Sequence, residues 1–181
     1  MAAERRKREV DLLQPLAGLV VEPLEWRRTG WSDRSWELHA ASAVVGELKL
    51  EGTFRVRAVG QTSAGRWQIE RLGFFGRQIE VRTATGGVAA TVQRGWLGKG
   101  RVRLQTGREL NWLPTNFWMN RWAFVGEQGQ SFVEFAPGGG VFRRNYLVRV
   151  APEARGMHEL PVMIMLGHFL DVLRRRSQRH H

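Results

Sequence analysis

The chain of 181 residues contains no cysteine. This absence excludes a disulfide framework, a thiolate zinc site, a cysteine nucleophile and an iron–sulfur cluster. Long apolar runs are also scarce: the segment 160–173 is apolar except at Gly167, His168 and Asp171. Its fourteen residues would form a helix about 21 Å long, whereas the hydrocarbon core of a bilayer is about 30 Å thick. The sequence therefore predicts no transmembrane span.

Lysine is rare, and arginine supplies nearly all of the positive charge. Of the 28 basic residues only Lys7, Lys49 and Lys99 are lysines, and the chain has 17 acidic residues and a net charge of +11. Residues 1–9 carry +2 and residues 174–181 carry +4, so the body between them carries +5. Arginine suits phosphate recognition because its guanidinium group is a planar fork of donors. A GC-rich coding sequence gives the same excess of arginine, so charge alone leaves the partner open.

Apolar and polar residues alternate between residues 23 and 150, and glycine-rich segments interrupt the alternation. This pattern is typical of short antiparallel strands joined by tight turns. No glycine cluster has the spacing of a Walker or dinucleotide-binding loop, so hairpin turns are the preferred interpretation. Twelve strands are predicted, near 24–28, 36–41, 44–50, 53–59, 66–72, 77–84, 88–94, 101–105, 109–113, 120–126, 131–136 and 145–151.

A comparison of the chain with itself at a shift of 43 residues aligns several apolar columns. Trp26 aligns with Ile69 and Trp112, and Trp31 aligns with Phe74 and Phe117. We interpret the matched columns as inward-facing positions of three units with four strands each. Chance agreement is the alternative, because alternation alone generates coincidences.

The C-terminal segment differs in kind and predicts a helix over 159–173. Pro161 suits the first turn of a helix, and the run Arg174–Arg176 suits the negative end of the helix dipole. A helix that is apolar all round must be buried, and a barrel of twelve strands leaves space at its centre. The sequence therefore predicts a mainly β fold, a closed twelve-stranded antiparallel barrel of three units of about 43 residues around a C-terminal hydrophobic helix. Residues 1–18 and 174–181 are expected to be basic tails flanking one barrel domain, 19–173.

This combination resembles the tubby C-terminal-like superfamily, which includes tubby domains, phospholipid scramblases and the LURP-one-related proteins. The strand register from 24 to 150 and the helix 161–173 carry the resemblance, and segments 36–50, 79–92 and 122–135 are the most similar. The chain lacks the cysteine cluster and the proline-rich N-terminal segment of scramblases. The resemblance implies a cytoplasmic protein, peripheral at a membrane, that binds the head groups of acidic or phosphoinositide-like phospholipids. Scramblase-like lipid transfer is an alternative within the same family.

Six arginines next to inward apolar residues are predicted to face outward as a cationic stripe: Arg55, Arg57, Arg82, Arg101, Arg103 and Arg149. Each base near an anionic leaflet contributes about 1 kcal/mol of attraction. Trp96 and Trp118 lie in predicted loops, and an exposed tryptophan beside arginine suits a membrane interface. The stripe is explained equally well as a solvated face neutralised by glutamates. The alternative function is a nucleic-acid-binding or protein-interaction domain with a basic surface, although the chain has no recognised nucleic-acid motif.

The sequence contains no recognisable catalytic, metal or cofactor constellation apart from one ambiguous pair. His168 and Asp171 lie three residues apart on one helix face, so their side chains can meet. The pair is either a buried acid–base couple or a polar pair at the mouth of the barrel that backbone groups or water satisfy. We favour the second interpretation, and we expect a protein that is not an enzyme and that holds neither metal nor cofactor.

Overall fold

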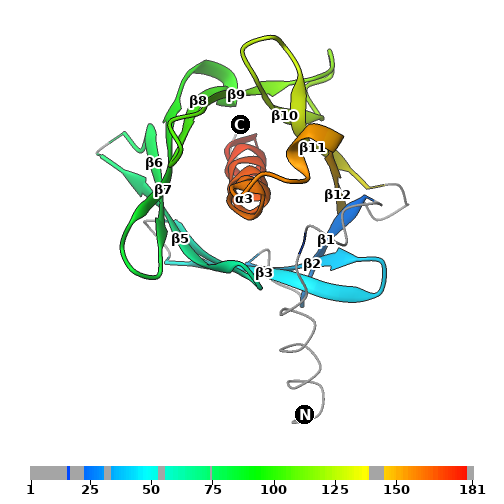
Figure 1. Cartoon of the computed structure of the whole chain (residues 1–181). Coiled ribbons are helices and arrows are strands. Elements are labelled where there is room, and N and C mark those ends of the chain that lie inside the picture. The colour runs from blue at the N-terminus through cyan, green and yellow to red at the C-terminus, as the bar shows by residue number, and fades with distance from the viewer. Residues whose placement is uncertain are drawn as a thin grey trace.

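The computed structural model describes residues 16, 23–30, 34–52, 56–73, 75–138 and 145–178. Each strand in these ranges pairs antiparallel with its neighbours in sequence, and the first strand pairs with the last, so the sheet closes into a barrel (Figure 1). The strands are β1 (Leu24–Arg28), β2 (Ser35–Ala40), β3 (Ala43–Glu51), β4 (Arg57–Thr62), β5 (Gly65–Leu72), β6 (Gln78–Thr83), β7 (Val88–Arg94), β8 (Gly100–Leu104), β9 (Glu109–Pro114), β10 (Trp122–Val125), β11 (Ser131–Pro137) and β12 (Asn145–Val150).

Alternation along each strand decides which side chains enter the barrel. In β5, for example, Trp67 and Ile69 are buried, whereas Arg66 and Gln68 between and beside them are exposed. Register shifts interrupt the pairing after Leu38, Val81 and Phe124. Such bulges increase the local twist and help a sheet to curve. The three shifts lie 43 residues apart, which equals the period of the predicted repeat; the repeat itself stays a prediction.

The helix α3 (Leu160–Gln178) runs through the middle of the barrel (Figure 1). All fourteen residues from Leu160 to Leu173 are buried. The barrel wall approaches the helix closely at two places. A Cβ atom on Gly46 would lie 2.9 Å from Cε of Met165, and a Cβ atom on Gly167 would lie 2.2 Å from Cζ of Phe135. The prediction of a closed twelve-stranded barrel around a hydrophobic helix is confirmed.

The main differences from the predicted boundaries concern the C-terminal helix, the fourth strand and the N-terminal tail. The helix continues to Gln178 rather than ending at 173, because Arg174 and Arg175 both pair with Asp171, at 2.7 and 2.6 Å. The first five residues of the expected C-terminal tail are therefore helical. The fourth strand begins at Arg57 rather than near residue 53. Leu16, which was assigned to the N-terminal tail, is buried in the hydrophobic core.

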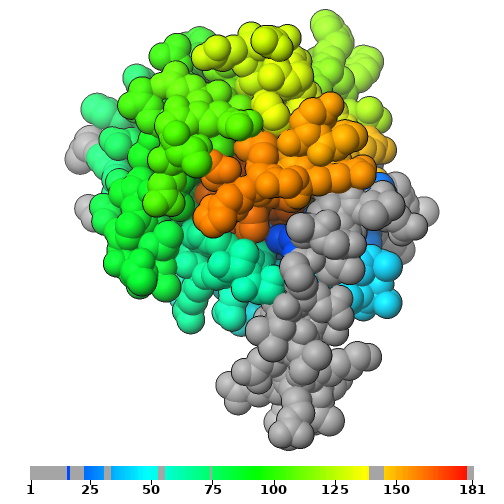
Figure 2. All heavy atoms as spheres, in the orientation of Figure 1, coloured from blue at the N-terminus to red at the C-terminus, as the bar shows by residue number. Residues whose placement is uncertain are grey.

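The antiparallel order gives the barrel two distinct ends. Loops that follow odd-numbered strands share one end, and loops that follow even-numbered strands share the other. The C-terminus of α3 lies at the first end, where Arg174 packs near Gly98 of the β7–β8 loop. Its N-terminus lies at the second end, where Glu159 accepts a hydrogen bond from Thr106 of the β8–β9 turn. Figure 2 looks onto the second end, which the segment between β12 and α3, drawn in orange, partly covers.

Candidate functional site

Large apolar side chains are exposed almost entirely at one end of the barrel. Phe75, Trp96, Leu97, Phe117 and Trp118 are between 67% and 90% exposed. They occupy the loops β5–β6, β7–β8 and β9–β10, which all follow odd-numbered strands. We call this the aromatic end, and the opposite one the turn end. Single exposed apolar residues are ordinary, but a gathering of them at one end marks an interaction site.

The β9–β10 loop is held firmly behind its exposed aromatic tip. The side-chain oxygen of Asn116 accepts hydrogen bonds from the backbone N–H groups of Asn120 and Arg121, at 3.2 and 3.1 Å. The indole N–H of the buried Trp122 donates to the carbonyl of Met119 at 2.8 Å. In Figure 1 this loop projects beyond the ring of strands, between β9 and β10. The backbone bonds are thus satisfied within the loop, while Phe117 and Trp118 face outward.

The β7–β8 loop presents its tip in a similar way. It contains the short helix η1 (Trp96–Gly98), and the N–H of Gly95 donates to the carbonyl of Lys99 at 2.8 Å. Leu97 has a φ of +56°, and Met119 of the other loop has a φ of +50°. A left-handed conformation costs a non-glycine residue about 1–2 kcal/mol. Strain of this kind gathers at binding sites, and here it adjoins Trp96 and Trp118.

Basic residues surround these tips. The aromatic end comprises the described loops that follow odd-numbered strands, together with the two strand residues on either side of each loop. They hold ten bases and one acid, Glu51, whereas the same count at the turn end gives six bases and four acids. The ten bases are Arg27, Arg28, Arg34, Arg57, Arg71, Arg77, Arg94, Lys99, Arg101 and Arg121. The end of α3 adds Arg174–Arg176, so exposed aromatic rings and positive charge coincide.

The predicted arginine stripe is not assembled as expected. Four of its members face outward and pair with glutamates: Arg57 with Glu51, Arg82 with Glu80, Arg103 with Glu109, and Arg149 with Glu134, at 2.5–3.2 Å. They lie on β4, β6, β8 and β12, and three strands separate β12 from either β4 or β8. Only Arg101 and Arg103 share a strand and a face. Arg55 lies outside the described residues. This arrangement resembles the neutralised outer face that was the alternative.

The predicted locations of the tryptophans agree with the structure wherever it describes them. Trp96 and Trp118 are exposed in loops, as predicted. Five others, which were expected in the core, are buried: Trp26, Trp36, Trp67, Trp112 and Trp122. Trp31 lies outside the described residues. The prediction for Phe117 is wrong. Its aligned column was interpreted as inward-facing, but its side chain is 90% exposed. The flanking Asn116 and Asn120, which favour turns, were the signal that could have placed it in a loop.

His168 and Asp171 do not form the expected pair. The His168 ring is fully buried and stacks on Trp26, with centroids 4.5 Å apart, while Trp36 meets it edge-on at 5.1 Å. Neither ring nitrogen has a hydrogen-bond partner among the residues that the structure describes. Burial, and then the charge of Arg175, lower the pKa of His168 well below its usual value. The imidazole is therefore neutral, and Asp171 binds Arg174 and Arg175 instead.

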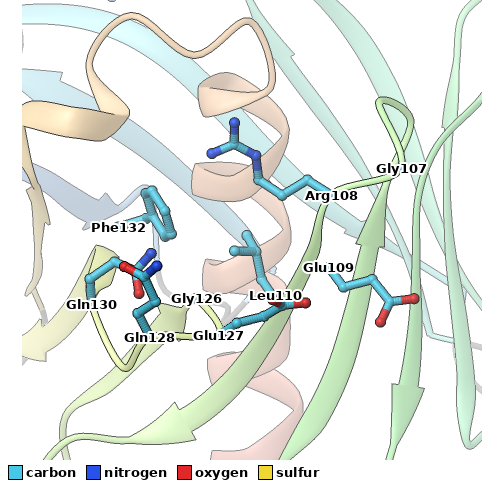
Figure 3. A pocket seen from close by; sticks show the side chains of 9 residues that line it. All are labelled: Gly107, Arg108, Glu109, Leu110, Gly126, Glu127, Gln128, Gln130 and Phe132. Atoms are coloured by element: carbon cyan, nitrogen blue, oxygen red, sulfur yellow. The ribbon is translucent and has the colours of Figure 1, made fainter.

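A shallow pocket of about 520 Å³ opens at the turn end (Figure 3). It is lined by residues 107–110, 126–128, Gln130 and Phe132, from the β8–β9 and β10–β11 turns. Arg108 lies over the ring of Phe132 at 5.6 Å, and Glu109 pairs with Arg103. The pocket therefore lies away from the exposed aromatic tips. Within the described ranges, no group of three or more His, Asp or Glu side chains could hold a metal ion.

The part of the chain that the structure describes has no helix with the length and apolar character needed to cross a bilayer. No protein-family model, no curated protein and no solved structure matches the chain. The resemblance to the tubby C-terminal-like superfamily therefore stays a prediction.

Proposed function

We propose that this protein is a non-enzymatic module that binds the surface of membranes rich in acidic phospholipids through its aromatic end. The observation that supports the proposal is the coincidence, at one end of the barrel, of five exposed apolar side chains with ten bases and a single acid in the described loops and strand ends. Tryptophan is enriched where hydrocarbon meets head groups. Each base near an anionic leaflet adds about 1 kcal/mol of attraction before salt screening.

One side chain at the tips favours lipid over nucleic acid. Trp96, Phe117 and Trp118 could stack on unpaired bases as well as enter a bilayer interface. Leu97, which is 67% exposed, has no ring that could stack on a base. The free-energy cost of its apolar surface in water is relieved only when that surface enters an apolar medium. Its φ of +56° keeps it at the tip beside Trp96. A tip made of tryptophan and leucine therefore fits hydrocarbon better than it fits an oligonucleotide.

Cosedimentation with vesicles tests the proposal. We expect the protein to bind vesicles of phosphatidylcholine mixed with phosphatidylserine at low salt, and to bind pure phosphatidylcholine far more weakly. Binding should weaken as salt rises, because the Debye length shortens from about 30 Å at 0.01 M to about 10 Å at 0.1 M. Absence of binding to anionic vesicles at low salt would refute the proposal.

Matched variants locate the binding surface. Leu97→Ser should weaken vesicle binding, whereas Val88→Ser, an exposed apolar site at the turn end, should not. Arg121→Gln should weaken binding more than Arg66→Gln, which removes the same charge at the turn end. If a single-stranded oligonucleotide displaces the vesicles and its own binding ignores Leu97→Ser, the nucleic-acid alternative replaces the proposal.

A further inference from the structure

Three arginines lie at the rim of the barrel where β5 and β7 end and β6 begins. Arg71 follows Trp67 and Ile69 on the inward side of β5, and Arg94 follows Val92 on the inward side of β7. Arg77 lies in the β5–β6 loop, and its carbonyl accepts the backbone N–H of Arg94 at 2.7 Å. Because successive side chains of a strand point to opposite faces, Arg71 and Arg94 occupy inward-facing positions at the mouth rather than positions on the outer wall.

These arginines differ from the outward ones in having no acid beside them. Among the described residues, no carboxylate lies within 4.0 Å of Arg71, Arg77 or Arg94. Arg94 is half-buried, and its Nε has no hydrogen-bond partner in the same part of the chain. Burial, and then the charge of Arg71, lower the pKa of the Arg94 guanidinium from its usual value. Two neighbouring cations without an anion are a costly arrangement that a bound anion would relieve.

The loop geometry fixes one of the two cations. The Nε of Arg71 donates to the carbonyl of Gly76 at 3.3 Å. Gly76 has a φ of +56°, and a Cβ atom there would lie 2.5 Å from Nη2 of Arg71. An alanine at this position would therefore displace the end of the Arg71 side chain and would carry the strain of a positive φ. Phe75 directly precedes Gly76, and Trp96 follows Arg94 by two residues, so the two arginines are flanked by two exposed aromatic tips.

We propose that Arg71 and Arg94, with Arg77 at the edge, form a binding site for a phosphate group, and that a phospholipid of the membrane supplies it. Two planar forks offer paired donors to one phosphate group, which is the geometry arginine favours for phosphate. A phosphomonoester fits better than a phosphodiester, because it presents three free oxygens and up to two negative charges. This inference rests on the proposed membrane function and adds a preferred head group to it.

The test compares vesicles that contain phosphatidic acid, a phosphomonoester lipid, with vesicles that contain phosphatidylserine at equal surface charge. We expect phosphatidic acid to bind about tenfold more tightly, which corresponds to about 1.4 kcal/mol. Arg71→Gln and Arg94→Gln should lose this preference while still binding phosphatidylserine. Arg101→Gln removes a charge from the same end outside the site, and it should weaken binding to both lipids equally.

Two further variants keep the test decisive if a glutamine variant fails to fold. Arg94→Lys keeps the charge but removes the fork, and Gly76→Ala keeps every charge but displaces Arg71. Both should reduce the preference for phosphatidic acid. Equal binding of the two lipids by the wild-type protein, or a preference that survives these variants, refutes the site and leaves membrane binding intact. If neither vesicle binds but inorganic phosphate binds saturably and needs Arg94, the site stands and its lipid source is refuted.

Discussion

Replacing Gly167 by alanine tests how tightly α3 fills the barrel. In an exposed helix this change would stabilise the protein by about 1 kcal/mol. Here the new Cβ atom would lie 2.2 and 2.3 Å from two atoms of the Phe135 ring and 3.0 Å from the Phe124 ring. The Phe135 ring is itself held by Trp112, with centroids 5.5 Å apart, so it has little room to withdraw.

The expected result is a destabilised protein. Overpacking a dense core costs about 1–3 kcal/mol, and contacts under 2.5 Å to a fixed ring place this case in the upper half of that range. After the gain in helix propensity, Gly167→Ala should lower the free energy of unfolding by about 1–2 kcal/mol. For a chain of this size the melting temperature should fall by about 2–8 °C.

Denaturant titration and thermal unfolding measure the change, and a second substitution identifies its cause. Phe135→Leu removes the ring edge that the new Cβ atom would meet. In this background Gly167→Ala should cost much less, giving a coupling energy above about 0.5 kcal/mol. A melting temperature that rises on Gly167→Ala alone would refute the reasoning, because it would show that α3 has space around it.

Three further predictions concern the helix and its polar groups. The pKa of His168 is held below the usual 6.5, so below that pH the unfolded chain binds a proton that the folded protein does not. The free energy of unfolding should therefore fall by up to about 1.4 kcal/mol for each unit by which the pH is lowered. His168→Phe should flatten this slope in titrations at pH 5 and pH 7, and an unchanged slope would contradict the assignment. Asp171→Asn leaves Arg174 and Arg175 without their partner and should cost about 3 kcal/mol, whereas Glu51→Gln, in the exposed pair with Arg57, should change little. Equal effects of the two substitutions would refute the distinction. Deleting 160–181 should abolish cooperative folding, and a soluble truncated barrel with a sharp transition would contradict the filled-barrel architecture.

The fold could be predicted closely from the sequence because burial imposes a period. Inward positions of a barrel strand must be apolar, so the alternation of Trp67 and Ile69 with polar residues is enough to predict β5. The unbroken apolar helix required an enclosing wall, and that requirement identified a closed barrel. The end of α3 was missed because Arg174 and Arg175 read as a solvated tail. Their pairing with Asp171 depends on a helix turn that composition does not reveal.

The site could be predicted only in part. Trp96 was identified because arginine and glycine surround it in the sequence, which marks a polar loop. The arginines of the predicted stripe are spread around the barrel, because alternation along a strand gives the face of a residue but not its position around the barrel. Arg149 and Arg57 alternate alike, yet three strands separate them. The paired arginines at the rim, Arg71 and Arg94, were missed as a site because their proximity arises only when β5 and β7 end at the same mouth.

The central claim is that the aromatic end enters the membrane interface, and quenching by brominated phospholipid tests it most directly. With the protein bound to anionic vesicles that carry brominated acyl chains, we expect strong quenching of tryptophan fluorescence. Most of it should disappear in the Trp96→Phe and Trp118→Phe double variant, because the other tryptophans that the structure describes are buried inside the barrel. Bound protein whose fluorescence is not quenched, or quenching that the double variant retains in full, would contradict the account.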